Sequence, residues 1–164
     1  MKNIWAWGAN NYGQLGLATM SEQENCPVKI VTSVPGELCR QIVGGGGHTL
    51  MLGHDGSVHG TGWNHVGQLG LGHTDPVTQF TKLDLTFCGD TKIVSLAAGW
   101  DFSLLLTEHG DVYSCGSNTF GQLGQLHFKL CSDRLLLSYS SKIKSTYCSN
   151  ICVITSHNLN YSHD

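Results

Sequence analysis

The pattern Gly-x-Asn-x-x-Gly-Gln-Leu-Gly occurs three times in this chain of 164 residues, and the copies are equally spaced. They run from Gly8 to Gly16, from Gly62 to Gly70 and from Gly116 to Gly124. We call the interval from Gly8 to Gly62 the repeat period. The same period holds between the copies, where it separates Gly56 from Gly110. A constant period in this range indicates a supersecondary unit that is duplicated along the chain.

Each repeat consists of short apolar and β-branched segments separated by glycine-rich turns, a composition that predicts β-strands. Asp55-Gly56 and His109-Gly110 predict two-residue hairpin turns, because glycine reaches positive φ at little cost. We therefore predict an all-β fold in which residues 41–60 and 95–114 form superimposable antiparallel sheets. A β-unit of about 50 residues is typical of one blade of a β-propeller.

The composition changes at about residue 125, where the repeats stop. All 21 glycines and all three prolines lie at or before Gly124. We therefore divide the chain into a repeat part, residues 1–124, and a non-repeat tail, residues 125–164, which we expect to be irregular and not to extend either sheet as a regular blade. The tail is either a genuine alternative C-terminus or aberrant coding sequence such as translated intron, and its lack of periodicity favours the second.

The charge of the chain argues against several classes of partner. The repeat part holds five Lys and Arg against ten Asp and Glu, and it has no basic tract that would neutralise phosphates, so we expect no nucleic-acid binding. No apolar run has the length of a signal peptide or a membrane span. The seven cysteines are odd in number and scattered, unlike a disulfide framework. These features predict a cytoplasmic protein without membrane insertion.

The sequence shows no pattern typical of a catalytic or cofactor site. Five histidines cluster in one repeat but fall on different expected strands and loops, which favours scattered surface and loop histidines: His48, His54, His59, His65 and His73. No nucleophile–base pair or paired carboxylates accompany them. We therefore predict that the chain is not an enzyme in the bond-making sense and needs no cofactor.

Two further motifs are weak signals. The tail contains Cys148-x-x-x-Cys152 with His157 and His163 nearby, but a zinc site needs four ligands at suitable spacing, and we predict no metal. The four glycines 44–47 lead into His48-Thr49 instead of the Lys-Ser or Lys-Thr of a phosphate loop, so they predict a tight turn between strands.

The segments AWGANNYGQLGLA, GGGGHTLMLGHDGSVHGTGWNHVGQLGLGHTD and AAGWDFSLLLTEHGDVYSCGSNTFGQLG resemble the regulator of chromosome condensation repeat. The resemblance covers residues 3–124. It implies a seven-bladed β-propeller, of which this chain would hold a part: two complete repeats and the start of a third. The tail would follow the last of them.

The resemblance also implies a function. Members of this family use the propeller as a protein-binding surface, and some promote guanine nucleotide exchange on a small GTPase of the Ran type. The chain would then be a binding module resembling such an exchange factor, with a Ran-like GTPase or secretion machinery as partner, a role in the regulation of secretion, and a cytoplasmic or nuclear location. The alternative is a truncated, non-functional or dominant-interfering fragment without exchange activity.

Within the repeats, the motif residues are expected to serve packing. The leucines of Gly-Gln-Leu-Gly would fill the gap between blades, and the glutamines would satisfy loop backbone groups. Binding would then fall to exposed loop residues, and we select Trp63, His65, Trp100 and Asp101. For Trp100-Asp101, an interaction hot spot and a capped turn remain equal alternatives. An incomplete ring leaves a blade face open, so we expect marginal stability and a tendency to aggregate.

Overall fold

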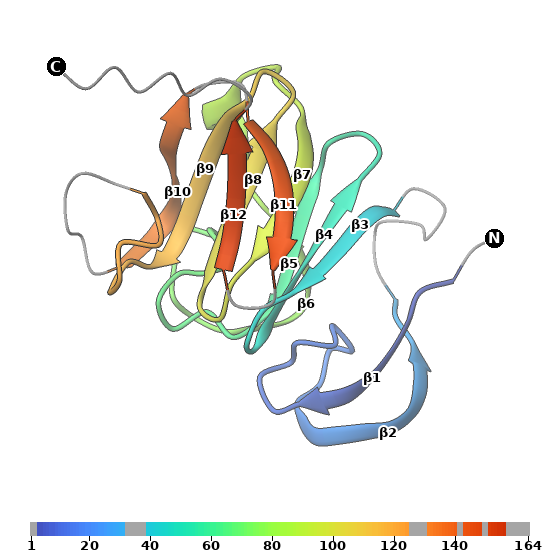
Figure 1. Cartoon of the computed structure of the whole chain (residues 1–164). Coiled ribbons are helices and arrows are strands. Elements are labelled where there is room, and N and C mark those ends of the chain that lie inside the picture. Colours follow the sequence, from blue (N-terminus) through green and yellow to red (C-terminus); the bar gives the residue numbers. More distant parts are fainter. Residues whose placement is uncertain (1–2, 32–38, 125–130, 141–142, 149–150, 157–164) are drawn as a thin grey trace, which may run out of the picture.

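The computed structural model describes the backbone of residues 3–31, 39–124, 131–140, 143–148 and 151–156, and the side chains within the first two of these ranges. Two four-stranded antiparallel sheets dominate it (Figure 1). The first blade consists of β3 (Cys39–Gly44), β4 (His48–Gly53), β5 (Val58–Gly62) and β6 (Val77–Lys82). The second blade consists of β7 (Ile93–Ala98), β8 (Phe102–Thr107), β9 (Asp111–Ser117) and β10 (Cys131–Ser140).

Two strand pairs accompany these blades. β1 (Trp5–Asn10) pairs with β2 (Ser21–Lys29), and β11 (Ile143–Cys148) pairs with β12 (Ile151–Ser156). A shift by one repeat period brings β1 onto β5 and β2 onto β6, so this first pair is the outer half of an earlier blade, and we call it the half-blade. The predicted all-β class is confirmed. The described residues also contain the 3-10 turn η1 (Thr86–Cys88), and they include no helix long and apolar enough to cross a membrane.

The two blades repeat each other's hydrogen-bond register at the repeat period. Cys39 faces Gly53 across β3 and β4, and Ile93 faces Thr107 across β7 and β8. In both blades a register shift follows directly after this pair, and the later pairs again match residue for residue. The prediction of superimposable sheets is therefore confirmed, down to the irregularity in the first strand pair.

Gly56 and Gly110 occupy equivalent hairpin turns, as predicted, with φ of 86° and 94°. The predicted two-residue turn is wrong. The Gly56 N–H donates to the carbonyl of Gly53 at 3.1 Å, so Gly56 is the fourth residue of a β-turn. Among the described non-glycine residues, only Ala18 has positive φ, so His54 and Asp55, which precede Gly56, have negative φ. Since non-glycine residues resist positive φ, glycine occupies this fourth position, which is the one that needs positive φ in a three-residue hairpin loop.

The asparagine of each repeat motif closes the loop that connects the third and fourth strands. Asn64 is fully buried, and its Oδ1 accepts the Leu69 N–H at 2.9 Å. Its Nδ2 donates to the carbonyls of His73 and Asp75 at 2.8 and 3.1 Å. The other two copies make the same bond from leucine N–H to asparagine Oδ1. One side chain thereby pairs three backbone groups that the loop cannot pair by itself.

The motif glutamines also bind loop backbone, which confirms their expected role. Gln68 Oε1 accepts the Val66 N–H at 3.2 Å, and the glutamines of the other two copies accept the equivalent N–H. The side chains of the motif thus hold each loop in one shape.

Each blade is tied to the loop of the unit before it by a hydroxyl group. Thr49 Oγ1 donates to the Gln14 carbonyl at 2.8 Å, and Ser103 Oγ donates to the Gln68 carbonyl at 2.6 Å. Thr49 and Ser103 are one repeat period apart, as are the two glutamines, so one junction is built twice. The repeat therefore specifies the contact between blades as well as each blade.

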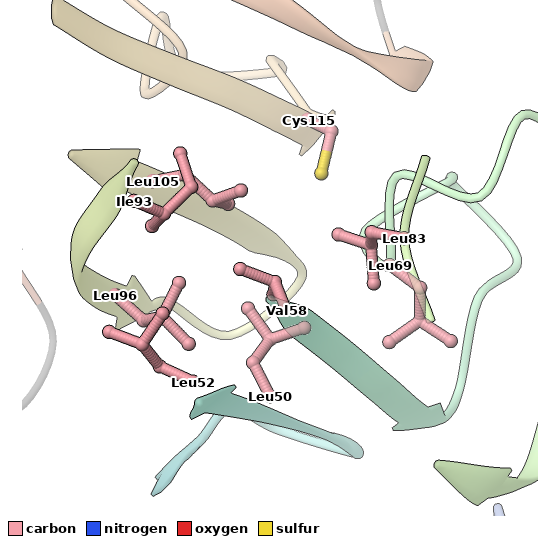
Figure 2. Close-up of a cluster of buried hydrophobic side chains, with 9 residues drawn as sticks. All are labelled: Leu50, Leu52, Val58, Leu69, Leu83, Ile93, Leu96, Leu105 and Cys115. Atoms are coloured by element: carbon pink, nitrogen blue, oxygen red, sulfur yellow. The ribbon is translucent and has the colours of Figure 1, made fainter. Parts of the chain in front are cut away.

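An apolar cluster fills the junction between the two blades (Figure 2). The cluster combines side chains of both blades, and its fully buried members are Leu50, Leu52, Val58, Leu69, Leu83, Ile93, Leu96, Leu105 and Cys115. Leu69 is the leucine of the second motif, so its expected role between blades is confirmed. Burial of each such side chain contributes about 1.5–3 kcal/mol, which makes this cluster the main cohesive force of the described structure.

The tail departs from the expectation in part. β10 lies in residues 131–140 of the tail and pairs antiparallel with β9, which makes it the fourth strand of the second blade. The expectation that the tail would be irregular and would not extend either sheet as a regular blade is therefore wrong for this segment. Two register shifts interrupt the pairing. Backbone hydrogen bonds do not depend on side-chain identity, so the open edge of β9 accepts a strand that lacks the repeat pattern.

We predict that Asn64→Ala lowers the free energy of unfolding by about 3 kcal/mol or more, because it leaves one loop N–H and two carbonyls without their partner. Urea denaturation followed by circular dichroism measures this change. Asn25→Ala, at an exposed position in β2, is the matched control and should change stability little. Equal effects of the two substitutions would contradict the role assigned to Asn64.

Candidate functional site

The loops that carry the selected residues lie at one end of the blades. Because the strands are antiparallel, the β3–β4 and β7–β8 turns fall at the same end as the β1–β2 and β5–β6 loops. The β4–β5 and β8–β9 turns fall at the opposite end. Trp63 and His65 lie in the β5–β6 loop, and Trp100 and Asp101 lie in the β7–β8 turn. All four selected residues therefore share one end of the molecule.

Three aromatic rings from two loops stack on one another at this end. The ring centroids of Tyr12 and Trp63 are 4.8 Å apart with 16° between the ring planes. The centroids of Trp63 and His65 are 3.8 Å apart with 11° between the planes. Tyr12 and His65 are exposed, whereas Trp63, which stacks on both, is half-buried, so its expected exposure is corrected. Stacking of this kind holds the rings in place. Tyr12 comes from the β1–β2 loop, so the stack also bridges the half-blade and the first blade.

Trp100 lies beside this stack on the glycine turn of the first blade. Its carbonyl accepts the Gly46 N–H at 2.9 Å, and a Cβ on Gly46 would stand 2.7 Å from the indole Cδ2. A Cβ on Gly47 would stand 2.9 Å from the Tyr12 ring and 3.3 Å from Trp63 Cβ. Because glycine has no Cβ, the Trp100 indole can lie against Gly46, and the stack of Tyr12 and Trp63 can lie against Gly47. We call Tyr12, Trp63, His65 and Trp100 the aromatic loop face.

Asp101 follows Trp100 but differs from it in exposure. Trp100 is 71% exposed, whereas Asp101 is half-buried and its carbonyl accepts the Ser117 N–H at 2.9 Å. The backbone of Asp101 therefore has a structural role in the turn, and a role of its side chain in binding stays a prediction. Glycines 45–47 form the turn between β3 and β4, and Gly44 is the last residue of β3, so the predicted tight turn is present.

Two of the five clustered histidines are buried, which corrects the expectation of surface and loop positions. His48 lies in β4 and His59 in β5, and both are almost fully inaccessible. The His48 ring bridges the blades through a 2.9 Å contact between Nε2 and Ser103 Oγ. Since Ser103 donates to the Gln68 carbonyl, Nε2 donates to Ser103. Burial lowers the pKa of His48 to about 4, and burial with the nearby Lys82 ammonium lowers the pKa of His59.

The opposite end carries a depression of about 640 Å³ lined by charged residues of both signs, among them Asp55, Lys82, Asp84 and Lys92. Hydrogen bonds from Ser57 lower the pKa of Asp55, and hydrogen bonds from Thr86 lower the pKa of Asp84. These carboxylates cap their own turns. Within residues 3–31 and 39–124, no group of three or more His, Cys, Asp or Glu is placed to hold a metal ion. The side chains of Cys148 and Cys152, and residues His157 and His163, lie outside the described part.

The repeat geometry matches a known family. The model of the regulator of chromosome condensation (RCC1) repeat matches residues 3–52 and 55–106, and a second model of this repeat matches residues 93–122. The chain belongs to the RCC1 repeat family. RCC1 repeats therefore cover the half-blade, the first blade and most of the second blade, in agreement with the resemblance seen in the sequence.

Curated relatives show how much of an RCC1 protein this chain represents. It is 45% identical over 125 residues to the secretion-regulating guanine nucleotide exchange factor of Bos taurus, a match that covers 76% of this chain and 26% of that protein. It is 36% identical over 121 residues to the ultraviolet-B receptor UVR8 of Arabidopsis thaliana, covering 74% and 27%. The chain thus spans about a quarter of the length of these relatives.

Solved structures confirm the propeller architecture. Human WBSCR16 superimposes with a TM-score of 0.80 at 23% identity, over 95% of this chain and 40% of that one. Prp20p of Saccharomyces cerevisiae, described with its binding properties to Gsp1p and histones, superimposes with a TM-score of 0.73 at 22% identity, over 85% and 35%. At this identity the likeness shows the fold alone. The RCC1 chain described here is a partial propeller.

Tyr12 and the motif asparagines contribute to this end of the molecule but were not predicted from the sequence. Tyr12, Val66 and Phe120 occupy one repeat position between asparagine and glycine, so an aromatic at the tip of the loop was a usable signal. The asparagine signal was also present, because the residue occurs in all three motifs, and Asn is a usual side-chain partner for loop backbone.

We predict that the stability of the RCC1 chain falls as the pH is lowered from 6.5 towards 4. The folded state keeps His48 neutral while the unfolded state binds a proton, so stability is complete above pH 6.5 and is lost towards the folded pKa of about 4. The full effect is roughly 3 kcal/mol. Urea denaturation at a series of pH values measures it.

The control for this pH dependence comes from the second blade, where Phe102 occupies the position of His48. His48→Phe should flatten the profile, leaving the smaller contribution of His59. His54→Gln, at an exposed turn position, should leave the profile unchanged. If His48→Phe retained the full loss of stability, His48 would not be the source.

Proposed function

We propose that this RCC1 chain is a protein-binding module that contacts its partner through the aromatic loop face. The observation that carries the proposal is the exposure of Trp100 beside the stack of Tyr12, Trp63 and His65. Tryptophan and tyrosine are enriched among the residues that dominate binding energy at interfaces. A rigid stack loses little conformational entropy when it is covered, which favours such a surface for recognition.

The partner we propose is a small GTPase of the Ran type or a component of the secretion machinery. The name of the relatives at 45% identity supports this class, since it describes a guanine nucleotide exchange factor that regulates secretion. Prp20p, which shares the fold, is described as binding Gsp1p. A location in the cytoplasm or nucleus goes with this proposal.

Nucleotide exchange requires a more extensive binding surface than binding of the GTPase alone. An exchange factor binds the nucleotide-free GTPase more tightly than the GDP complex, and by reciprocity it weakens the affinity for GDP. Such differential binding requires contacts that span the nucleotide site. This chain spans about a quarter of the exchange-factor relatives. We therefore propose binding without acceleration of exchange, in which case the chain would compete with complete relatives for their partner.

The second candidate is a fragment without any function. The two candidates differ in binding, because a non-functional fragment has no affinity for the partner, while a competing module binds it and slows exchange by a complete relative. A competition assay with the complete bovine relative therefore separates them.

We predict that the purified chain does not accelerate the release of fluorescent GDP from a Ran-type GTPase, whereas a complete propeller relative does. Addition of this chain in excess should slow the release catalysed by the complete relative. Release rates in the presence and absence of the chain measure both effects. Acceleration by the chain alone would place the exchange surface within the two blades and overturn the proposal.

The aromatic loop face predicts which substitutions abolish the competition. Trp63→Ala and Trp100→Ala should each weaken binding about tenfold, a loss typical of a central aromatic at an interface. Phe87→Ala is the matched control, because Phe87 is an exposed aromatic in η1 at the other end of the blades. Competition that survives both tryptophan substitutions, or that Phe87→Ala removes, would show that partners bind elsewhere.

Trp100→Ala combined with Asp101→Ala tests the two interpretations of this turn. If the side chain of Asp101 contributes to binding, the double variant binds more weakly than Trp100→Ala alone. If it has only the structural role of its backbone, the two variants bind equally.

A further inference from the structure

The charged side chains of the described residues are divided unequally between the two ends of the blades. Every Lys and Arg within residues 3–31 and 39–124 lies at the end opposite the aromatic loop face, where β2 and β6 end and β3 and β7 begin: Lys29, Arg40, Lys82 and Lys92. At the end that carries the aromatic loop face, the charged residues of the same ranges are all acidic: Glu22, Glu24, Asp75 and Asp101. The aromatic loop face therefore stands in an acidic surrounding.

The carboxylates of Asp75 and Asp101 differ from those of the opposite end in their hydrogen bonds. Asp55 and Asp84 each accept a backbone N–H of their own turn at 3.0 Å. The hydrogen bonds of Asp75 and Asp101 use their backbone groups instead, and within residues 3–31 and 39–124 no donor reaches either carboxylate. Both carboxylates are thus available to a cationic group of a partner.

The rings of the aromatic loop face also present surfaces that suit a cation. Trp63 is the middle ring of the stack, so Tyr12 and His65 each keep an outer face, and both residues are exposed. Trp100 is exposed as well, and no ring of the described residues stacks on its indole. The face of an aromatic ring attracts a cation, and Arg is found there more often than Lys.

We propose that the partner of the aromatic loop face presents an arginine-rich segment, whose guanidinium groups stack on the exposed rings and pair with Asp75 and Asp101. This inference rests on the proposed function, because it concerns the chemistry of the partner at the same face. A guanidinium group fits both features of the face, since it stacks on an aromatic plane and donates two parallel hydrogen bonds to a carboxylate.

Other kinds of segment fit this face less well. An acidic segment or a nucleic acid is repelled by the like charge of this end. An apolar segment that covered Trp100 would also remove water from Asp101, the next residue, and a carboxylate that loses water without gaining a partner is strongly destabilised. A lysine-rich segment supplies the charge but not the plane that stacks. Arginine alone satisfies the rings and the carboxylates together.

The separation of charge also predicts how the partner approaches. Complementary charge at one end of the molecule orients a basic partner before contact and speeds association. Salt screens this attraction, so binding should weaken as the ionic strength rises.

Fluorescence anisotropy tests the proposal, with the full chain titrated into a fluorescein-labelled peptide in which arginine alternates with glycine. Two matched peptides replace every arginine by lysine, which keeps the charge, or by citrulline, which keeps the planar shape without the charge. We expect the arginine peptide to bind most tightly and the citrulline peptide most weakly. Absence of binding by the arginine peptide overturns the proposal. Equal binding of the arginine and lysine peptides overturns the assignment to arginine, because charge alone would then suffice.

Substitutions in the chain locate the site of peptide binding. Asp75→Asn and Asp101→Asn should each weaken binding of the arginine peptide about threefold, a loss typical of an exposed ion pair. Trp100→Ala should weaken it about fivefold through loss of the cation–π contact. Asp90→Asn is the matched control, because Asp90 is an exposed aspartate at the opposite end, and it should bind like the unaltered chain. Circular dichroism checks the fold of each variant.

Equal losses in Asp90→Asn and Asp101→Asn would overturn the proposal, because net charge and not the aromatic loop face would then attract the peptide. The competition assay with the complete bovine relative separates this inference from the proposed function. A chain that competes but does not bind the arginine peptide retains the proposed function and overturns the arginine contact. A chain that binds the peptide through Trp100 and Asp101 but does not compete supports the arginine contact and overturns the proposed GTPase partner.

Discussion

One kind of hydrogen bond fixes how neighbouring units of this RCC1 chain are arranged. It runs from a hydroxyl group of one blade to a backbone carbonyl in the motif of the preceding unit. Thr49 makes it to Gln14 and Ser103 makes it to Gln68, and both bonds lie in or beside the apolar junctions between units. A neutral hydrogen bond contributes only about 1 kcal/mol, but a buried carbonyl without one costs more. The bond therefore selects the angle and register of neighbouring blades, while the apolar cluster supplies the cohesion.

The packing of the motif residues also explains why the proposed binding surface consists of other side chains. Motif residues such as Asn64 and Leu69 are fully engaged in the loop and the junction, and they leave no group for a partner. Side chains at the variable positions of the motif and in the β7–β8 turn are free of this constraint. Trp63 and Trp100 stand at one end of the blades. The regular scaffold thus carries an apolar surface at this end.

The candidate site could be predicted in part. Trp63 and His65 lie two residues apart at variable positions of the second motif, so a shared loop followed directly from the sequence. Their stack with Tyr12 did not, because Tyr12 lies in another repeat and meets Trp63 only across a junction. The exposure of Trp100 was expected, whereas the backbone role of Asp101 depended on its contact with Ser117 in the next strand pair.

The sequence by itself determined the unit: its period, its strands, the glycine positions of its hairpins and the glutamine bonds within each loop. All of these depend on local spacing, which repeats without a shift. Tertiary structure decided which side of each strand is covered. It buried His48 against Ser103, exposed Trp100, and let β10 pair with β9 although the tail lacks the pattern. Such contacts join residues far apart in the chain or use backbone groups alone, so neither periodicity nor composition specifies them.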